Sequence, residues 1–336
     1  MVVAATGFFD GVHRGHRAVL DELKEAARLN SCESAVVTFW PHPRNVLQKD
    51  ASTLRLLNTL DEKKHLIQEY GIDKFFVIPF TKDFSRMDTA SFLREYLIER
   101  FGVSTLIIGY DHRLGNSSCG SRDELVEIAH SVGLETIVVS QVNSGEVTIS
   151  STKIRGAISA GDIVMASDML GYNYSLHGVV VLGNMIGRTI GFPTANMQLY
   201  EPLKIIPANG VYYVKVYLSS GEYKGICNIG NRPTVAKNND RTIETHILDF
   251  DEDIYGLDIR IEFVARLRDE IKFSSLEQLK DRISKDKEFV KKMFSIFIPV
   301  GIEILCALVV KIKARSFAFH SLLSIFVVTT EIRLRS

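Results

Sequence analysis

The feature that most constrains the fold of this chain is a change in hydrophobic periodicity near residue 172. Before that point, short β-branched runs that are apolar throughout alternate with amphipathic stretches, which is the order expected of strand and helix units. The predicted strands are residues 2–6, 34–40, 74–78, 105–109 and 134–140, and the predicted helices are residues 15–29, 61–70, 89–101 and 123–132. Apolar strands joined by helices predict a doubly wound parallel sheet covered on both faces.

The second half of the chain changes to period-two alternation interrupted by glycine turns. The alternating runs are residues 177–182, 211–218, 223–229, 242–249 and 259–268. Five or more such runs predict a closed antiparallel sheet or a sandwich. Residues 275–293 follow as a predicted helix that Ser274 or Ser275 opens. A length of 336 residues suits two domains, which we place at residues 1–172 and 173–293.

Residues 294–336 form a third segment that contains two apolar runs, 304–310 and 316–330. Neither run reaches the roughly 20 residues that a helix needs to span a bilayer, so a membrane anchor is disfavoured. A strand pair and an extension produced by a shifted reading frame explain this composition equally well, and an exposed apolar tail favours aggregation. We assign the segment no function.

Charge and cysteine content narrow the partners and the compartment. Forty basic side chains balance forty acidic ones, so no overall field attracts nucleic acid, and phosphate recognition must come from local geometry. The four cysteines have no C-x-x-C spacing and indicate neither a disulfide framework nor a thiolate zinc site. The first residues lack the basic and long apolar regions of a signal peptide. These features favour a reducing cytoplasm and predict nothing about oligomeric state.

The first chemical motif is G-F-F-D-G-V-H-R-G-H, residues 7–16, between the first predicted strand and its helix. A helix N-terminus presents unpaired N–H groups and a positive dipole to an anion. Gly7 and Gly15 let the backbone on either side of Phe9 approach a phosphate. His13 and His16 can donate to oxygens that gain charge during transfer. The motif predicts a nucleotide cradle, although an isolated H-x-G-H is explained equally well as polar residues at a helix start.

Two further segments are expected at the carboxyl ends of strands, where ligands bind in open parallel sheets. One is T-F-W-P-H-P, residues 38–43, and the other is S-S-T-K-I-R, residues 150–155. The hydroxyls of Ser151 and Thr152 and the guanidinium of Arg155 suit triphosphate oxygens. His42 stands between two prolines, which a rigid loop explains better than catalysis does.

The second half opens with a glycine-rich segment, residues 183–196, that ends in P-T-A-N. Gly183 and Gly187 predict a flexible flap that wraps ATP phosphates, and no Gly-Lys-Ser/Thr follows as in a Walker A loop. One residue separates Thr194 from Asn196, so in an extended strand both side chains face one side and can share a hard cation. Taken alone, P-T-A-N is more typical of a turn at a strand end.

The motifs of the first half resemble the nucleotidylyltransferase superfamily. Together with G-Y-D-H-R-L-G at residues 109–115 they resemble its FMN adenylyltransferase branch, which commonly has phenylalanine where Leu114 stands. The order of the P-T-A-N segment, N-I-G-N-R-P-T at 228–234 and E-T-H-I-L-D-F at 244–250 resembles riboflavin kinase. From about residue 2 to residue 293 the chain therefore resembles the bacterial bifunctional riboflavin kinase/FAD synthetases.

The resemblance implies a Rossmann-like doubly wound nucleotidylyltransferase domain followed by a small antiparallel six-stranded β-barrel kinase domain. The kinase domain is expected to transfer the γ-phosphoryl group of ATP to riboflavin, giving FMN. The first domain is expected to transfer AMP from ATP to FMN, giving FAD and pyrophosphate. The implied partners are riboflavin, FMN and ATP, and the implied metal is Mg²⁺.

The resemblance also implies roles for individual residues. Glu244 is expected to be the general base of the kinase, with Thr194 and Asn196 holding Mg-ATP. His13, His16 and Arg155 are expected to serve the α-phosphoryl transition state. The expected ATP-binding residues are Gly7, Phe9, Gly15, Ser151, Thr152, Gly183, Gly187, Thr194 and Asn196, and the expected flavin-binding residues are Asp111, Arg268 and Glu270.

Simpler explanations of these residues stay open. A turn explains Asp111 as well as a ligand contact does, a lone strand glutamate such as Glu244 is usually solvated, and a surface charge cluster explains Arg268 and Glu270 nearly as well. Another H-x-G-H transferase, acting on a pantetheine or pyridine nucleotide, leaves the P-T-A-N half unexplained. A flavin carrier without turnover is the alternative outside enzymes. Met1 stands at the first strand, where family members usually have a preceding segment, so we expect a less complete sheet edge.

Overall fold

The structure is a computed structural model that describes residues 1–47, 54–109, 121–139, 149–183, 185–231 and 241–297. The chain forms two compact units. The first unit comprises residues 1–160, 165–172 and 201–206, and the second comprises residues 161–164 and 173–200 and continues from residue 207. Residues 201–206 therefore belong to the first unit, although residues of the second unit precede and follow them in the sequence.

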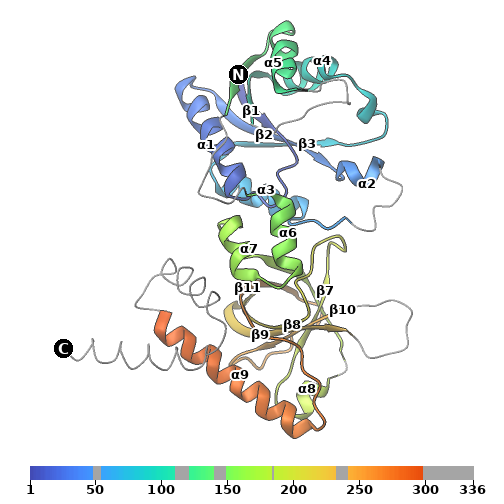
Figure 1. The fold of residues 1–336 in the computed structure, drawn as a ribbon, viewed down its shortest axis with the longest axis vertical. Helices are drawn as coiled ribbons and strands as arrows, with labels where there is room; N and C mark the ends of the chain where they lie inside the picture. The colour runs from blue at the N-terminus through green and yellow to red at the C-terminus, as the bar shows by residue number, and fades with distance from the viewer. Residues whose placement is uncertain (48–53, 110–120, 140–148, 184, 232–240, 298–336) are drawn as a thin grey trace, which may run out of the picture. The chain divides into compact units, whose positions relative to one another are not determined.

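The first unit contains a five-stranded parallel sheet (Figure 1). Its strands are β1 (Val2–Thr6), β2 (Glu33–Trp40), β3 (Lys74–Pro79), β4 (Val103–Ile108) and β5 (Glu135–Val138), in the order β3-β2-β1-β4-β5. The strand order reverses between β1 and β4, and open parallel sheets bind ligands beyond the carboxyl ends of the strands at such a point. The predicted parallel sheet is confirmed, and its reversal point adjoins the motif that follows β1.

Alternate residues of β1 face two different hydrophobic clusters, which is why the strand is apolar throughout. Val3 and Ala5 pack with Leu20 and Leu23 of helix α1 (Arg14–Leu29). Helix α3 (Leu60–Glu69) contributes to the same face. The opposite face of the sheet packs against α4 (Thr89–Phe92), a π-helical segment (Leu93–Arg100) and α5 (Arg122–Ser131). The predicted helix at 89–101 is thus an α-helical turn followed by a wider π-helix.

Three shorter helices complete the path of the chain through this half. Helix α2 (Pro43–Leu47) follows β2, helix α6 (Ser151–Ser159) follows β5, and helix α7 (Ile163–Leu170) follows α6. The start of α6 carries the S-S-T-K-I-R motif, as the sequence predicts. None of the helices in the described ranges has an apolar stretch long enough to cross a membrane.

The second unit is a closed antiparallel barrel with the strand order β10-β7-β6-β11-β8-β9 (Figure 1). Its strands are β6 (Ser175–Val181), β7 (Ala195–Leu199), β8 (Gly210–Leu218), β9 (Gly221–Asn231), β10 (Arg241–Ile247) and β11 (Asp258–Arg268). The barrel confirms the implied kinase fold and decides against a sandwich. Five of the strands match the alternating runs, and β7 is the sixth strand that those runs did not include.

Two helices accompany the barrel. The short helix α8 (Ile186–Thr189) lies within the glycine-rich segment before β7. Helix α9 (Leu276–Phe297) begins after Ser275, whose Oγ accepts a hydrogen bond from the backbone N–H of Gln278 at 3.3 Å. Val290 of α9 packs with Val211, Tyr213, Ile226 and Leu248 of the barrel unit. The helix runs four residues past the predicted end at Met293, and residues 298–336 of the tail segment lie outside the described residues.

Candidate active sites

The loop that follows β1 has an unusual backbone. Phe9, Gly11 and Val12 all have positive φ angles, of 48°, 91° and 36°. A β-carbon at Gly11 would lie 2.7 Å from Cδ1 of Leu57, so the loop passes too close to its neighbour for a side chain there. Gly7 at the start of the loop donates its backbone N–H to Val37 of β2 at 3.0 Å. These contacts hold the loop across the carboxyl edge of the sheet.

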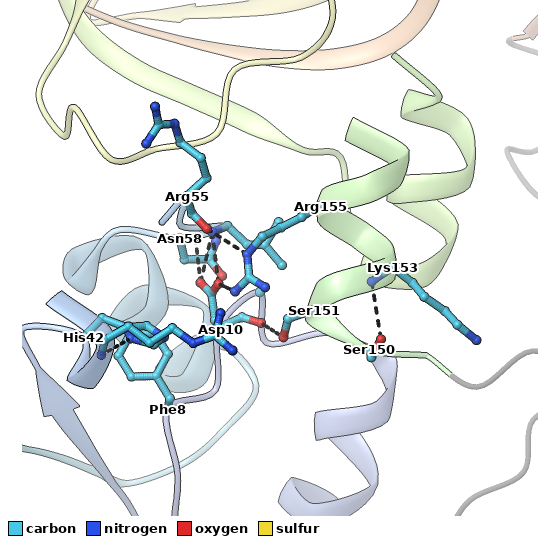
Figure 2. Close-up of polar contacts among 12 residues, drawn as sticks. Phe8, Asp10, His42, Arg55, Asn58, Ser150, Ser151, Lys153 and Arg155 are labelled. Carbon is cyan, nitrogen blue, oxygen red and sulfur yellow. Dashed lines mark hydrogen bonds and ion pairs between the residues drawn. The ribbon is translucent and has the colours of Figure 1, made fainter. Parts of the chain in front are cut away.

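Asp10 is the organising side chain of this loop (Figure 2). It is 4% exposed and accepts backbone hydrogen bonds from Leu57 at 3.0 Å and Asn58 at 3.2 Å. It also pairs with Nη2 of Arg155 at 2.5 Å. A buried carboxylate is stable only when its oxygens are paired in this way. Asp10 was not predicted from the sequence as a site residue, although it lies inside the motif at residues 7–16.

Helix α6 is attached to the same loop by its first turn (Figure 2). Ser151 donates its hydroxyl to the backbone carbonyl of Asp10 at 2.9 Å, and Arg155 donates Nε to the carbonyl of Arg55 at 2.7 Å. Ser150 caps the helix by accepting the N–H of Lys153 at 3.3 Å. Thr152 is exposed at the second position of the helix. The structure therefore brings Ser151 and Arg155 to the loop as expected and already engages both in protein contacts.

The two motif histidines stack on each other at the start of α1. Their ring centroids are 3.7 Å apart with an angle of 14° between the planes, and Phe9 packs edge-on against His16 at 5.2 Å. Gly15 lies between them in the first turn of α1, which has no side-chain cap. Burial lowers the pKa of His16 well below its usual value, and the nearby His13 and Lys63 lower it further. His16 is therefore neutral at pH 7 and can still donate one N–H.

The opposite side of the loop meets the end of β2. The rings of Phe8 and His42 are 4.0 Å apart, and His42 Nδ1 accepts the backbone N–H of Arg44 at 3.1 Å. Burial lowers the pKa of His42 to about 4, with Asp10 opposing the change. Lys63 of α3 places its ammonium 3.7 Å from the centroid of the Phe8 ring. Lys63 was not predicted from the sequence as a site residue, and it shares a buried helix face with Ile67 one turn later.

The second site lies in the barrel, where β7 pairs with β6 on one side and β10 on the other. Asn196 of β7 stands directly opposite Glu244 of β10 and opposite Val181 of β6. Directly opposed residues of antiparallel strands project from the same face of the sheet. The predicted base and one predicted metal ligand are therefore neighbours, although they are 48 positions apart in the sequence. Asn196 is 8% exposed, and Glu244 is half-buried.

The glycine-rich segment folds back on these strands. A β-carbon at Gly183 would overlap the side-chain amide of Asn196, so the backbone itself packs against that amide. Gly187 lies in α8, and Thr194 is half-buried at the entry to β7. His246, two residues after Glu244, hydrogen-bonds through Nδ1 to the carbonyl of Pro193 at 2.8 Å. His246 was not singled out from the sequence, and it links β10 to the P-T-A-N segment.

The donor atoms near β7 suit Mg²⁺ better than a transition metal. Thr194 and Asn196 offer neutral hydroxyl and amide oxygens, and Mg²⁺ prefers oxygen ligands that it shares with substrate phosphates. The described ranges contain no cluster of three His, Cys, Asp or Glu side chains suited to a metal. An ion bound here would therefore depend on the charge of a phosphorylated substrate.

The predicted flavin-binding residues fall in different situations. Arg268 donates Nε to the Asp286 carboxylate of α9 at 2.9 Å, and its Nη2 is also 2.9 Å from that carboxylate. Glu270 is exposed and lies against Gly230 of β9. Asp111 lies outside the described residues. Arg268 thus holds a helix to the barrel in addition to any ligand contact.

Comparison with known proteins covers both halves of the chain. The family described as FAD synthetase matches residues 1–153, and the family described as riboflavin kinase matches residues 170–294. A bifunctional riboflavin kinase/FMN adenylyltransferase from Bacillus subtilis is 35% identical over 295 residues, which cover 87% of this chain and 92% of that protein. A protein of the same name from Escherichia coli is 35% identical over 299 residues, covering 88% and 94%.

A solved structure is similar over the same extent. It is described as a macrolide-efflux protein from Streptococcus pneumoniae, is 29% identical and has a TM-score of 0.79. The match covers 86% of this chain and 93% of that one. The arrangement of a parallel sheet followed by a closed barrel is therefore shared with a solved structure.

Proposed function

This chain belongs to the family of bifunctional riboflavin kinase/FMN adenylyltransferases, and from that premise we propose which of its residues perform each step. The enzyme phosphorylates riboflavin with ATP to give FMN, and it adenylylates FMN with a second ATP to give FAD and pyrophosphate. We assign the adenylyltransferase to residues 1–172 and the kinase to residues 173–293. Riboflavin, FMN and ATP are its substrates.

In adenylyl transfer, a phosphate oxygen of FMN attacks the α-phosphorus of ATP while the bond to the bridging oxygen of the β-phosphate breaks. The nucleophile is already an anion, so catalysis requires alignment and charge stabilisation and no strong base. His13 and His16 donate N–H groups to the α-phosphoryl oxygens, and the uncapped start of α1 supports an anion there. Arg155, which is paired with Asp10, stabilises the negative charge of the α-phosphoryl transition state.

The remaining residues of the first site bind substrate. Backbone groups near Gly7 and Gly15 and the ring of Phe9 border the ATP site. Thr152 presents its hydroxyl and Ser151 its backbone amide at the start of α6, where the helix dipole favours phosphate. Asp111 is assigned to FMN.

In the kinase, Glu244 accepts the proton of the terminal ribityl hydroxyl as that oxygen attacks the γ-phosphorus of ATP. Its place opposite Asn196 on β7 supports this role, because the base and the ATP-binding residues then share one face. Thr194 and Asn196 would hold Mg²⁺, which neutralises charge on the transferred phosphoryl group. Gly183 and Gly187 border the ATP phosphates. Arg268 and Glu270 are assigned to the flavin.

The observation that carries this proposal is the separation of the two sites into two compact units, each with its own predicted phosphate-binding segment. It predicts that the activities can be removed one at a time. His16→Ala should reduce FAD formation from FMN by about 10²-fold or more, because a donor to the transition state is lost. Riboflavin phosphorylation should continue in the same variant.

Glu244→Gln should have the opposite effect, with FMN formation lost and FAD formation from added FMN retained. Each variant receives Mg-ATP with either riboflavin or FMN, and products are separated by chromatography. His65→Ala is the matched control for the histidine, because that side chain is 78% exposed on α3. Unchanged FMN formation in Glu244→Gln would remove Glu244 from its role. A wild-type chain that binds flavin without making FMN or FAD would be a carrier.

A further inference from the structure

We propose that Lys63 binds a phosphoryl oxygen of the nucleotide substrates in the adenylyltransferase site, an inference that rests on the function proposed above. Lys63 lies in the first turn of α3 with 0% of its surface exposed. Within the described part of the chain its Nζ has no hydrogen-bond acceptor. A buried ammonium carries three donors, and leaving them unused is unfavourable unless a ligand supplies acceptors. The unused donors of this side chain therefore indicate that an anion binds beside it.

The position of the ammonium places that anion in the first site. Nζ lies 3.7 Å from the centroid of the Phe8 ring, within the motif that follows β1. Its charge lowers the pKa values of both His16 and His42, so it is electrostatically close to both imidazoles. Phe8, His16 and His42 come from the β1 loop, the start of α1 and the end of β2. The first two belong to the motif at residues 7–16, for which the sequence predicts a nucleotide cradle, and the third carries the T-F-W-P-H-P segment expected at the same edge of the sheet.

The carboxylates of Asp10 and Glu62 are already paired with other groups. Asp10 accepts hydrogen bonds from Leu57 and Asn58 and pairs with Arg155. Glu62, the residue before Lys63, accepts the backbone N–H of Thr59 at 2.9 Å and pairs with the buried Lys204. The charge of Asp10 is thus balanced by Arg155, and that of Glu62 by Lys204. Among the residues that the structure describes, Lys63 remains as a positive charge without an ion-pair partner.

The chemistry of the reaction supplies such a counter-ion. Adenylyl transfer brings the phosphate of FMN against the triphosphate of ATP, and both are anions that repel each other. A cation excluded from water attracts phosphate more strongly than an exposed one does. Because His16 and His42 are neutral at pH 7, an ammonium at this position supplies charge that the imidazoles do not. Either ATP or FMN can provide the oxygen, and the two sources are separable by experiment.

The protonation of Lys63 gives a second line of test. Burial lowers its pKa to about 8, and the Asp10 carboxylate acts in the opposite direction. The other charged or titratable groups around it are Arg155, His16, His42 and Glu62. Above pH 8 the free enzyme loses the ammonium and with it the attraction for phosphate. The value of kcat/KM for FAD formation should therefore fall on the alkaline side.

The test compares Lys63→Met and Lys63→Arg with the matched control Lys64→Met, because Lys64 is an exposed neighbour on α3. Lys63→Met keeps a long unbranched side chain and removes its charge, so kcat/KM for FAD formation should fall by about 10²-fold. Lys64→Met should remain within about 2-fold of the wild type. Lys63→Arg should keep most of the activity and lose the fall above pH 8, since arginine does not titrate there.

Titration of each variant with ATP alone and with FMN alone identifies the source of the oxygen. A loss of ATP affinity assigns Lys63 to the triphosphate, and a loss of FMN affinity assigns it to the flavin phosphate. A fall in kcat with both affinities intact assigns it to the transition state. Each of these results supports the proposal.

Two results would overturn it. One is Lys63→Met with the same kcat/KM as Lys64→Met, and the other is Lys63→Arg with the same alkaline fall as the wild type. If Lys63→Met also loses riboflavin phosphorylation and therefore its fold, the pH profile of Lys63→Arg decides. A wild-type chain that forms no FAD would refute the proposed function itself, which is a distinct result.

Discussion

Burial decides which side chains of the first site carry charge. It lowers the pKa of His42 to about 4 and that of His16 well below its ordinary value, so both imidazoles are neutral at pH 7. The positive charge near the loop comes instead from Arg155 and Lys63, and Arg155 shares its charge with Asp10. On the proposed function, His16 would act as a neutral donor, and Lys63 and Arg155 would supply the electrostatic attraction.

The lowered pKa of His42 predicts a pH dependence of stability. Because the folded pKa is about 4 and the ordinary value is 6.5, the unfolded chain binds the proton first as the pH falls. The contribution is fully present above pH 6.5 and is lost between pH 6.5 and 4. His42→Asn keeps an acceptor for the Arg44 N–H and removes the titration. We expect the wild type to lose about 2 kcal/mol more free energy of unfolding than the variant over this range.

The measurement uses the fluorescence of Trp40, the chain's one tryptophan, which ends β2 two residues before His42. Urea unfolding is followed at several pH values between 7.5 and 4.5. His65→Asn, at an exposed position of α3, serves as the control and should keep the wild-type profile. Parallel profiles for wild type and His42→Asn would contradict the prediction.

The helices differ in how their N-termini are capped and in how they are held to the rest of their unit. Helices α3, α5 and α6 begin with a side-chain cap, from Thr59, Ser121 and Ser150, whereas His13, the N-cap residue of α1, provides none. The first backbone N–H groups of α1, beside the motif histidines, therefore have no side-chain cap. In the barrel unit, α9 is attached by Arg268, whose guanidinium binds Asp286, a residue only 5% exposed.

Removing the Asp286 carboxylate should loosen α9. Asp286→Asn leaves Arg268 and Arg282 without their shared counter-ion, because Arg282 Nε is 3.3 Å from the same carboxylate. We expect a loss of about 2–3 kcal/mol in the local stability of β11 and α9, measured by hydrogen exchange of their amides. Asp281→Asn is the control, since its ion pair with Lys285 is 65% exposed on both sides and should contribute little. Equal exchange in the two variants would contradict this account.

At the scale of the whole molecule, the two units are not divided by a single point in the sequence. Residues 201–206 follow β7 of the barrel and belong to the first unit. There Leu56 exchanges backbone hydrogen bonds with Leu203 and Ile205, at 2.8 and 3.0 Å. Lys204 of this segment pairs with Glu62, which completes the capping box of α3. A piece of the kinase half of the sequence therefore contributes to the packing around the first site.

Two separate sites predict complementation between variants. A mixture of His16→Ala and Glu244→Gln should convert riboflavin to FAD, because FMN released by one variant is a substrate for the other. Neither variant alone should make FAD from riboflavin at an appreciable rate. The yield of FAD is followed by chromatography as the two variants are mixed in different ratios. Absence of FAD from the mixture, with both single activities intact, would show that FMN does not pass through solution.

Local patterns were sufficient for most of the fold. Every strand of the parallel sheet was predicted to within two residues at its start, because buried parallel strands read as apolar runs. The alternating pattern predicted every strand of the barrel except β7. That strand contains Asn196 and follows a glycine-rich segment, so its pattern was not recognised as a strand. The motif residues His13, His16, Ser151 and Arg155 did converge on one loop. Asp10 and Lys63 were missed because a single charged residue has no periodicity.

The amino-acid sequence alone determined the two fold classes, the order of the units and the motifs that predict phosphate binding, because each of these depends on residues close together in the chain. The tertiary structure alone decided which charges neutralise each other. Asp10 meets Arg155 across 145 positions, and Glu62 meets Lys204 across 142. Pairing at such separations depends on how strands and helices pack, and the burial that results lowers the pKa values of His16, His42 and Lys63.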